Sequence, residues 1–272
     1  MGTRASAWIV ALVFLSAVPL STSRAHADAE QDAAAEAQKA ASALAERMKS
    51  TDDAIKKAAL VEALKVHHPL VTAALARALS DADEGVRAAA LVALVARTDL
   101  VAKKAAAVAV AARLERIAKK SEDYPERLKV IAALHDLAQP SSLRALAAET
   151  GIDVTSEELV ARMHAIANLP SKDAIEEIIQ FRASGRRRGG ASEGPGQENR
   201  GKTARDAFAY AVGVDVGQDP DAMRAWWKEH EKGFDFSAAA ERRAREGSGP
   251  KAKGPDGKGA KAPDPGTPPK AK

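Results

Sequence analysis

The histidines are the side chains of this sequence best suited to acid–base chemistry or metal binding. His67 and His68 are adjacent, whereas His135 and His164 each lie alone in a separate helical pattern. A zinc site needs several Cys, His or carboxylate ligands at suitable spacing, but the chain has no cysteine and no carboxylate at ligand spacing beside the His-His pair. We therefore expect a polar turn at His67 and His68. His135 and His164 could face each other across packed helices, but we expect surface or hydrogen-bonded residues.

Other patterns that would indicate catalysis are missing from the sequence. We find no arrangement typical of an activated nucleophile, a carboxylate pair or a phosphate-binding loop. Ser141 and Ser142 occupy helix-start positions, and Gly189-Gly190 lacks the preceding strand and following helix of a nucleotide site. The sequence therefore predicts no catalytic, cofactor-binding or metal-binding residue, and no enzyme.

Three consecutive arginines are candidates for binding an anionic partner. Arg186, Arg187 and Arg188 lie in the glycine-rich segment 185–202, which has no apolar stripe and is therefore expected to be a flexible loop. Such a cluster attracts phosphate groups or other polyanions. The alternative, which we favour from the sequence, is a solvated loop without a partner.

Two adjacent tryptophans form the second candidate binding site. Trp226 and Trp227, with Phe234 and Phe236, concentrate much of the aromatic surface of a chain that is only 4% aromatic. A carbohydrate or peptide platform is one interpretation. We favour a helical cap over the end of the core, because two adjacent side chains on a helix point in different directions.

The elements that must position these residues are helices. We find no alternating run typical of strands, and the alanine-rich apolar positions recur at three- and four-residue steps. Residues 69–97 predict two helices joined by an acidic turn, in which Asp81 caps the second helix and Glu84 completes a capping box. Segment 105–112 is so dense in Ala and Val that we expect burial on most sides.

The pair of helices at 69–97 resembles a HEAT repeat of the short type also found in phycobilisome-lyase-like proteins. The resemblance rests on a proline opening the first helix, a turn aspartate, Val-Arg, and Ala-x-x-Ala-Leu on the second helix, here residues Pro69, Asp81, Val86, Arg87, Ala90, Ala93 and Leu94. It implies that Asp81 and Arg87 bond between neighbouring repeats as structural ladder residues. It also implies an α-solenoid of stacked helix pairs, for which we expect about eight to ten helices in an all-α fold.

The N-terminus has the features of a secretory signal peptide over residues 1–27. Arg4 precedes an apolar stretch at 7–20, and Ala25-His26-Ala27 is a small-x-small cleavage site. The apolar stretch is shorter than the ~20 residues of a membrane-spanning helix. We therefore expect cleavage after Ala27, export to the bacterial periplasm or exterior, and no stable membrane span thereafter. Without cysteine, the exported chain folds without disulfides.

The remaining organisation follows from composition. Residues 28–50 predict an Ala/Glu-rich helix that serves as an arm or an N-terminal cap, 51–184 the HEAT-like repeats, and 203–237 the C-terminal helices that cap the stack. Residues 238–272 are rich in Lys, Pro and Gly and are expected to be disordered. Such a basic tail is suited to salt-sensitive contact with an anionic surface.

These features favour a non-catalytic protein–protein interaction scaffold of the bacterial cell envelope, with an unidentified protein partner, no cofactor and no nucleic acid. Two alternatives stay open. One is a lyase-like or other enzyme accessory, which would need a small-molecule pocket in the solenoid with convergent polar groups. The other is a protein that binds an anionic envelope polymer through the basic loop and tail.

Overall fold

The protein is all-helical in the part of the chain that the computed structural model describes, residues 21–118, 123–148, 155–188 and 195–246. Twelve α-helices and one short 3₁₀ helix account for the regular structure of these residues, which contain no strand. The helices are α1 (Ser21–Arg47), α2 (Asp53–Ala63), α3 (Pro69–Ala78), α4 (Glu84–Val95), α5 (Leu100–Ile117), α6 (Tyr124–Leu137), η2 (Pro140–Ser142), α7 (Leu143–Ala147), α8 (Ser156–Ala167), α9 (Lys172–Arg188), α10 (Pro195–Val212), α11 (Pro220–His230) and α12 (Phe236–Glu246).

The helix count exceeds the eight to ten expected from the sequence. One reason lies at the C-terminus, where α12 continues the ordered chain through residues that composition assigned to the disordered tail from 238 onward. The Asp235 carboxylate accepts hydrogen bonds from the N–H groups of Ser237 and Ala238 at 2.8 and 3.1 Å, which caps this helix locally. The rest of the predicted tail, 247–272, lies outside the described residues.

The predicted flexible loop at 185–202 is also largely helical. Helix α9 continues to Arg188 and α10 begins at Pro195, so only 189–194 fall outside the described residues. Arginine is a good helix former and is favoured at a helix C-terminus, where its charge complements the helix dipole. Proline is favoured in the first turn, because the N–H that it lacks has no partner there.

The N-cap of helix α4 lies two residues after the predicted one. The N-cap is Asp83, whose carboxylate accepts the Val86 N–H at 2.8 Å. The Asp81 carboxylate instead accepts the Asp83 N–H at 2.9 Å, which makes the turn that leads into the helix. The predicted capping box at Asp81 and Glu84 is therefore wrong, because an aspartate that bonds two residues ahead forms a turn and leaves the cap to the next acceptor.

Replacing the cap tests this assignment. We expect Asp83→Ala to lower the melting temperature by roughly 2–4 °C, because the first turn of α4 loses its acceptor. Asp83→Asn is the matched control, since its side-chain carbonyl still accepts the Val86 N–H. Equal losses in the two variants, measured by circular dichroism on heating, would contradict the role of Asp83 as a cap.

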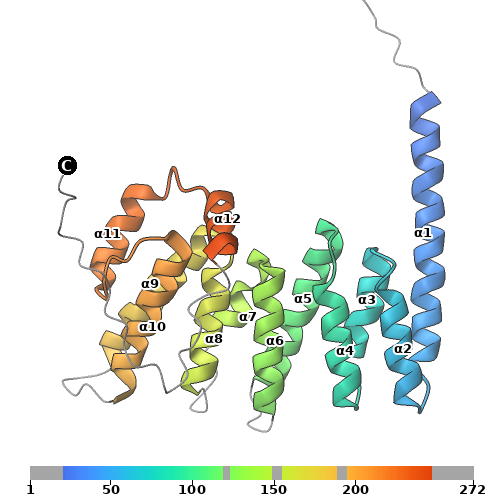
Figure 1. Ribbon diagram of the computed structural model, residues 1–272, viewed down its shortest axis with the longest axis horizontal. Helices are drawn as coiled ribbons and strands as arrows, with labels where there is room; N and C mark the ends of the chain where they lie inside the picture. Colours follow the sequence, from blue (N-terminus) through green and yellow to red (C-terminus); the bar gives the residue numbers. More distant parts are fainter. Residues whose placement is uncertain (1–20, 119–122, 149–154, 189–194, 247–272) are drawn as a thin grey trace, which may run out of the picture.

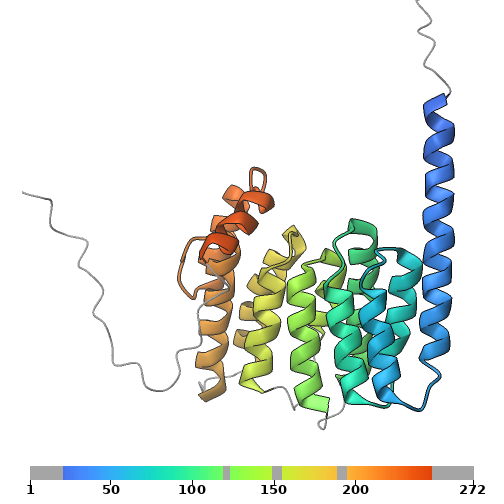
Figure 2. The ribbon, with the colours of Figure 1, turned by 45° about the vertical axis from the view of Figure 1, so that its right-hand side comes forward.

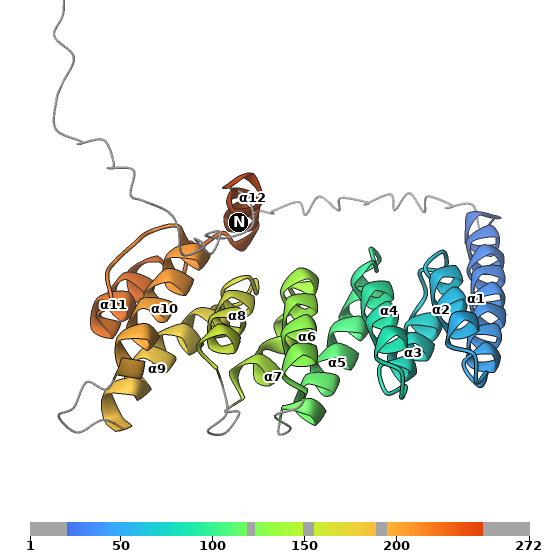
Figure 3. The same cartoon turned by 60° about the horizontal axis from the view of Figure 1, so that its bottom comes forward.

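The helices lie in two rows that run the length of the molecule (Figure 1). We call α2, α4, α6, α8 and α10 the B row, because each packs on the next in that order. Helices α1, α3, α5 and α7 form the A row behind them, and each A-row helix packs on the B-row helix that follows it in the chain. Figures 2 and 3 show the same succession from other sides, and Figure 3 shows α1 at one end, α11 at the other and α12 above α8.

The hydrophobic core fills the space between the rows. Its large members include Leu75 on α3, Leu94 on α4, Leu114 on α5 and Leu134 on α6, all fully buried. Alanines such as Ala90 are also fully buried and lie between the larger side chains. Small side chains allow the helix backbones to approach closely, which explains how an alanine-rich, aromatic-poor chain builds a packed interior.

Helix α1 is longer than the helix predicted at 28–50 and starts at Ser21, so the expected cleavage site at 25–27 lies within it. Its second half packs on α2 and α3 and buries Ala37 and Leu44. Its first half extends past the neighbouring helices (Figure 2). Among the described residues, no helix combines the length and apolar character needed to cross a membrane.

Candidate binding face

Ion pairs join successive B-row helices along the side of the row on which these helices begin. The Asp81 carboxylate accepts from Lys56 of α2 at 3.3 Å. Arg87 of α4 donates through Nε to Glu126 of α6 at 3.0 Å, and its Nη1 bonds the Asp81 and Ala82 carbonyls. Asp81 and Arg87 thus each contact a neighbouring helix pair, on opposite sides.

On the same side of the row, a buried charge cluster joins α6, α7 and α8. Glu158 of α8 is fully buried and accepts from Arg127 of α6 and Arg162 of its own helix, each at 3.0 Å. Arg162 also donates to the carbonyls of Ala145 and Leu146, at the end of α7. Sequence reasoning missed this cluster, although Glu158 lies in the first turn of α8, whose N-cap is Thr155.

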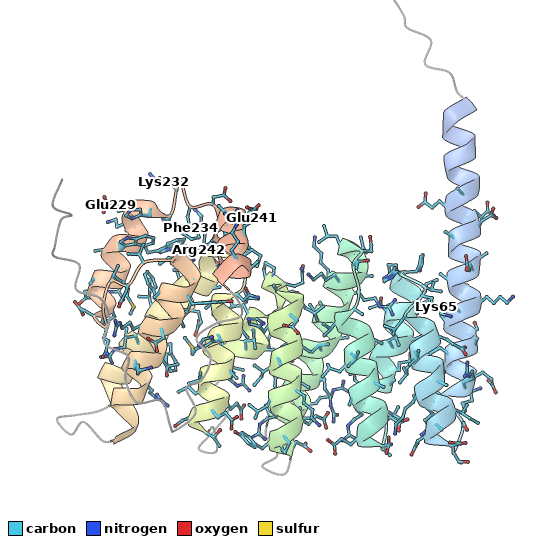
Figure 4. All side chains as sticks on the ribbon, in the orientation of Figure 1. Lys65, Glu229, Lys232, Phe234, Glu241 and Arg242 are labelled. Carbon is cyan, nitrogen blue, oxygen red and sulfur yellow. The ribbon has the colours of Figure 1, made fainter. Side chains whose placement is uncertain are left out.

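The opposite edge of the B row is held by arginines that bind helix C-termini. Arg97 donates to the carbonyls of Ala63 and Val66, at and just beyond the end of α2. Arg242 and Arg243 of α12 bond the last carbonyls of α10, and Figure 4 places Arg242 beside that helix end. These carbonyls have no partner within their own helix, so an inserted guanidinium satisfies them. Burial lowers the pKa of Arg97 and of Arg243, because loss of water disfavours the charged form.

Between these two edges, the outward surface of the B row carries exposed apolar side chains from four consecutive helices. They are Val61 on α2, Val92 on α4, Ala132 on α6 and Val160 on α8. Each of these helices is flanked by its neighbours and backed by the A row, so a side chain exposed at its middle must point outward. Val61 is 59% and Val92 is 65% exposed. We call this surface, defined by these four residues, the B face.

A polar cluster ends the B face at its C-terminal side, where α6, α8, α10 and α12 meet. The rings of His164 and Tyr210 lie 5.7 Å apart, and the Arg243 guanidinium lies over the Tyr210 ring at 5.5 Å. Asn168 joins the helices, since it accepts from Arg243 at 3.2 Å and donates to the His135 carbonyl at 2.9 Å. His164 stands one helical turn after Val160 and therefore continues the same face.

This cluster holds four helices together and contains two half-buried imidazoles, those of His135 and His164. Burial lowers the pKa of His164, the nearby His135 lowers it further, and Asp206 opposes both. The His164 imidazole lies against the Tyr210 ring with the two planes tilted by 36°, and Arg243 donates to Asn168 and to the Ala211 carbonyl. The two histidines lie within electrostatic range of each other, and the His135 ring bonds the Asp136 carboxylate at 3.0 Å.

The lowered pKa of His164 predicts a loss of stability in acid. The unfolded chain binds a proton at this histidine near pH 6.5, whereas the folded protein binds it only at lower pH. The unfolded state therefore holds more protons below about pH 6.5, and the free energy of unfolding falls as the pH decreases through that window. We expect His164→Gln to flatten this dependence, measured by urea unfolding between pH 7.5 and pH 5. The exposed His67→Gln is the control, and an unchanged slope in His164→Gln would contradict the assignment.

The predicted tryptophan site divides into a buried and a half-buried ring. Trp227 is 3% exposed and packs edge-on against Phe234, with ring centroids 5.4 Å apart. Trp226 is half-buried, contacts the Phe208 ring edge-on and stacks on His230 at 4.1 Å. Trp227 thus belongs to the core under α11, and Figure 4 shows Phe234 between α11 and α12. Arg186, Arg187 and Arg188 lie at the end of α9, and their side chains are outside the described part of the structure.

Small-molecule and metal sites find little support in the described residues. A shallow groove between α4 and α6 is lined by Arg87, Leu91, Glu126, Lys129 and their neighbours. It offers room for about one water molecule, far less than a ligand pocket. Within the described ranges, no three His, Asp or Glu side chains are grouped so that they could hold a metal ion.

Comparison of the whole chain with protein-family models and with curated proteins finds no match in either.

Proposed function

We propose that the protein is a non-catalytic protein–protein interaction scaffold, an α-solenoid of HEAT-like helix pairs that binds a protein partner along its B face. The observation that carries the proposal is the row formed by Val61, Val92, Ala132 and Val160. Stacked helix pairs generate extended surfaces of this kind, and contiguous exposed apolar side chains mark interaction sites. The packing order of the A and B rows supports the solenoid interpretation.

The chemistry of the face indicates the kind of partner. The apolar row is bordered by charged pairs, Glu84 with Lys129 and Asp83 with Lys57, and the polar cluster around His164 ends it. A helix or extended segment whose apolar side chains recur along its length fits such a surface, since it buries the valines and leaves the bordering charges in water. Asp81 and Arg87 act in this proposal as ladder residues that keep successive helix pairs in register.

We place this activity in the bacterial cell envelope. The proposal rests on the signal-peptide pattern of residues 1–27 and on the lack of cysteine in the sequence. The partner would then be an exported or membrane-attached protein with a segment that reaches the B face.

The test is affinity capture from an envelope fraction at low and high salt, with the wild-type chain and two variants. Val92→Glu places a charge within the B face, and Val108→Glu places the same charge on a similarly exposed valine of the A row. We expect a defined partner that the wild type and Val108→Glu retain and the B-face variant loses. Recovery of no protein, or equal recovery by all three, would overturn the proposal, as would tight binding of a small molecule in place of a protein.

A further inference from the structure

Helix α5 carries an apolar stripe on its outward side that nothing in the described structure covers. Val101, Ala105, Val108 and Ala112 follow one another at steps of four, three and four residues and so share one side of the helix. Val101 is 60% and Val108 is 57% exposed. The Ala/Val-rich segment 105–112, which we expected to be buried on most sides, is buried or half-buried at six of its eight positions, and only Val108 and Ala112 are exposed.

The neighbouring helix α3 extends this apolar surface. Leu70 is 42% exposed, and Ala73 lies beside it on the outward side. Three cations border the surface, Arg77 on α3 and Lys104 and Arg116 on α5, together with one exposed carboxylate, Glu115, so its border is net positive. We call this surface the A face and define it by Leu70, Ala73, Val101, Ala105, Val108 and Ala112.

The first half of α1 has the complementary character. Residues 29–36, which we call the arm, are all exposed, and the arm projects past the helices beside it (Figure 2). Ala37 and Leu44 pack on the body, and the same side of the helix continues into the arm through Ala29 and Ala33, which have no cover. The arm also carries three exposed carboxylates, Glu30, Asp32 and Glu36.

We propose that the arm of one copy of this chain docks on the A face of a second copy. The arm is about 12 Å long and the α5 stripe about 18 Å, at 1.5 Å per residue, so the stripe can accommodate the whole arm. Alanines on both surfaces let the two helices approach closely, while the arm's carboxylates meet the cations that border the A face. The arm cannot reach the α5 stripe of its own chain, because α1 is continuous and α3 lies between α1 and α5.

The contact is small, so we expect reversible association in the micromolar range or weaker, reduced by salt. Analytical ultracentrifugation of the full chain over a concentration series measures it. We expect Val108→Glu to weaken self-association by about tenfold or more, because it places a carboxylate under the acidic arm. Val92→Glu, the same change on the B face at a similarly exposed valine, is the matched control and should leave self-association unchanged.

Charge reversal and cross-linking identify the two surfaces. We expect Glu30→Lys with Glu36→Lys to abolish self-association, and Arg77→Glu with Lys104→Glu in the same chain to restore it. A photo-cross-linker at Ala33, with mixed isotope-labelled copies, should join the arm of one copy to residues 100–117 of another. A monomer at all concentrations, equal effects of Val108→Glu and Val92→Glu, or a cross-link only to another protein would overturn the proposal. Partner capture depends on the B face, so a failure of the self-association proposal would not contradict the proposed function.

Discussion

Replacing Glu158 by alanine is expected to lower the free energy of unfolding by about 3–5 kcal/mol. The Glu158 side chain is fully buried, and its two oxygens each lie 3.0 Å from an arginine, Arg127 on α6 and Arg162 on α8. Without the carboxylate, Arg162, which is almost as deeply buried, loses this counter-charge, and Arg127 loses its 3.0 Å contact with Glu158. The cost of leaving buried charges unpaired exceeds the net contribution of the intact cluster, which explains the size of the effect.

Urea unfolding followed by circular dichroism measures the effect of Glu158→Ala. Glu84→Ala is the matched control, since Glu84 also pairs across helices, with Lys129 at 2.8 Å, but both side chains are at least half exposed. Solvent screening and the loss of side-chain entropy offset the attraction in such a surface pair, so we expect Glu84→Ala to change the free energy of unfolding little. Similar losses in Glu158→Ala and Glu84→Ala would show that the buried cluster has no special role.

Replacing Arg97 by alanine is expected to cost about 3–4 kcal/mol. Its side chain is 2% exposed and donates to the carbonyls of Ala93, Ala63 and Val66. Truncation removes the guanidinium donors from the Ala63 and Val66 carbonyls, which keep only backbone N–H donors at 3.4 and 3.2 Å, and opens a cavity between α2 and α4. We expect Arg97→Lys to lose less, because one ammonium group keeps the charge but cannot reach all three acceptors.

Hydrogen exchange measures which helices Arg97→Ala destabilises. In stacked helix pairs each pair contacts mainly its neighbours, so we expect faster amide exchange in α1 and α2 and near-normal exchange beyond α6. Arg245→Ala is the control, because this arginine is exposed and pairs with Glu241 on its own helix. Uniform acceleration along the whole chain would contradict a local role for Arg97.

Most helices could be predicted from the sequence, because the signals that form them are local. The recurrence of apolar residues located α3 and α4, and Pro69 marked the start of α3. The error at Asp81 and Asp83 shows the limit of these signals. Two aspartates two residues apart suit the same turn, and the backbone conformation alone determined which of them caps α4.

The candidate site was less predictable, because exposure depends on neighbours that are distant in sequence. Val92 and Leu94 look alike in the sequence, yet Val92 is 65% exposed and Leu94 is fully buried. The pairing of Arg97 with the end of α2 spans more than 30 residues, and no short pattern indicates it. The B face and the A face therefore emerged only when the rows were assembled.

By itself, the sequence determined that the described chain is helical, where most helices begin, and that no catalytic motif is present. These properties follow from backbone propensity, capping and periodicity, which act within a few residues. The tertiary structure alone decided which charges are buried and which valines face water. Glu157 and Glu158 are adjacent and chemically equivalent, but Glu157 is exposed and Glu158 lies between two arginines. Packing of α6 against α8 makes that difference, because burial is a property of the assembled rows.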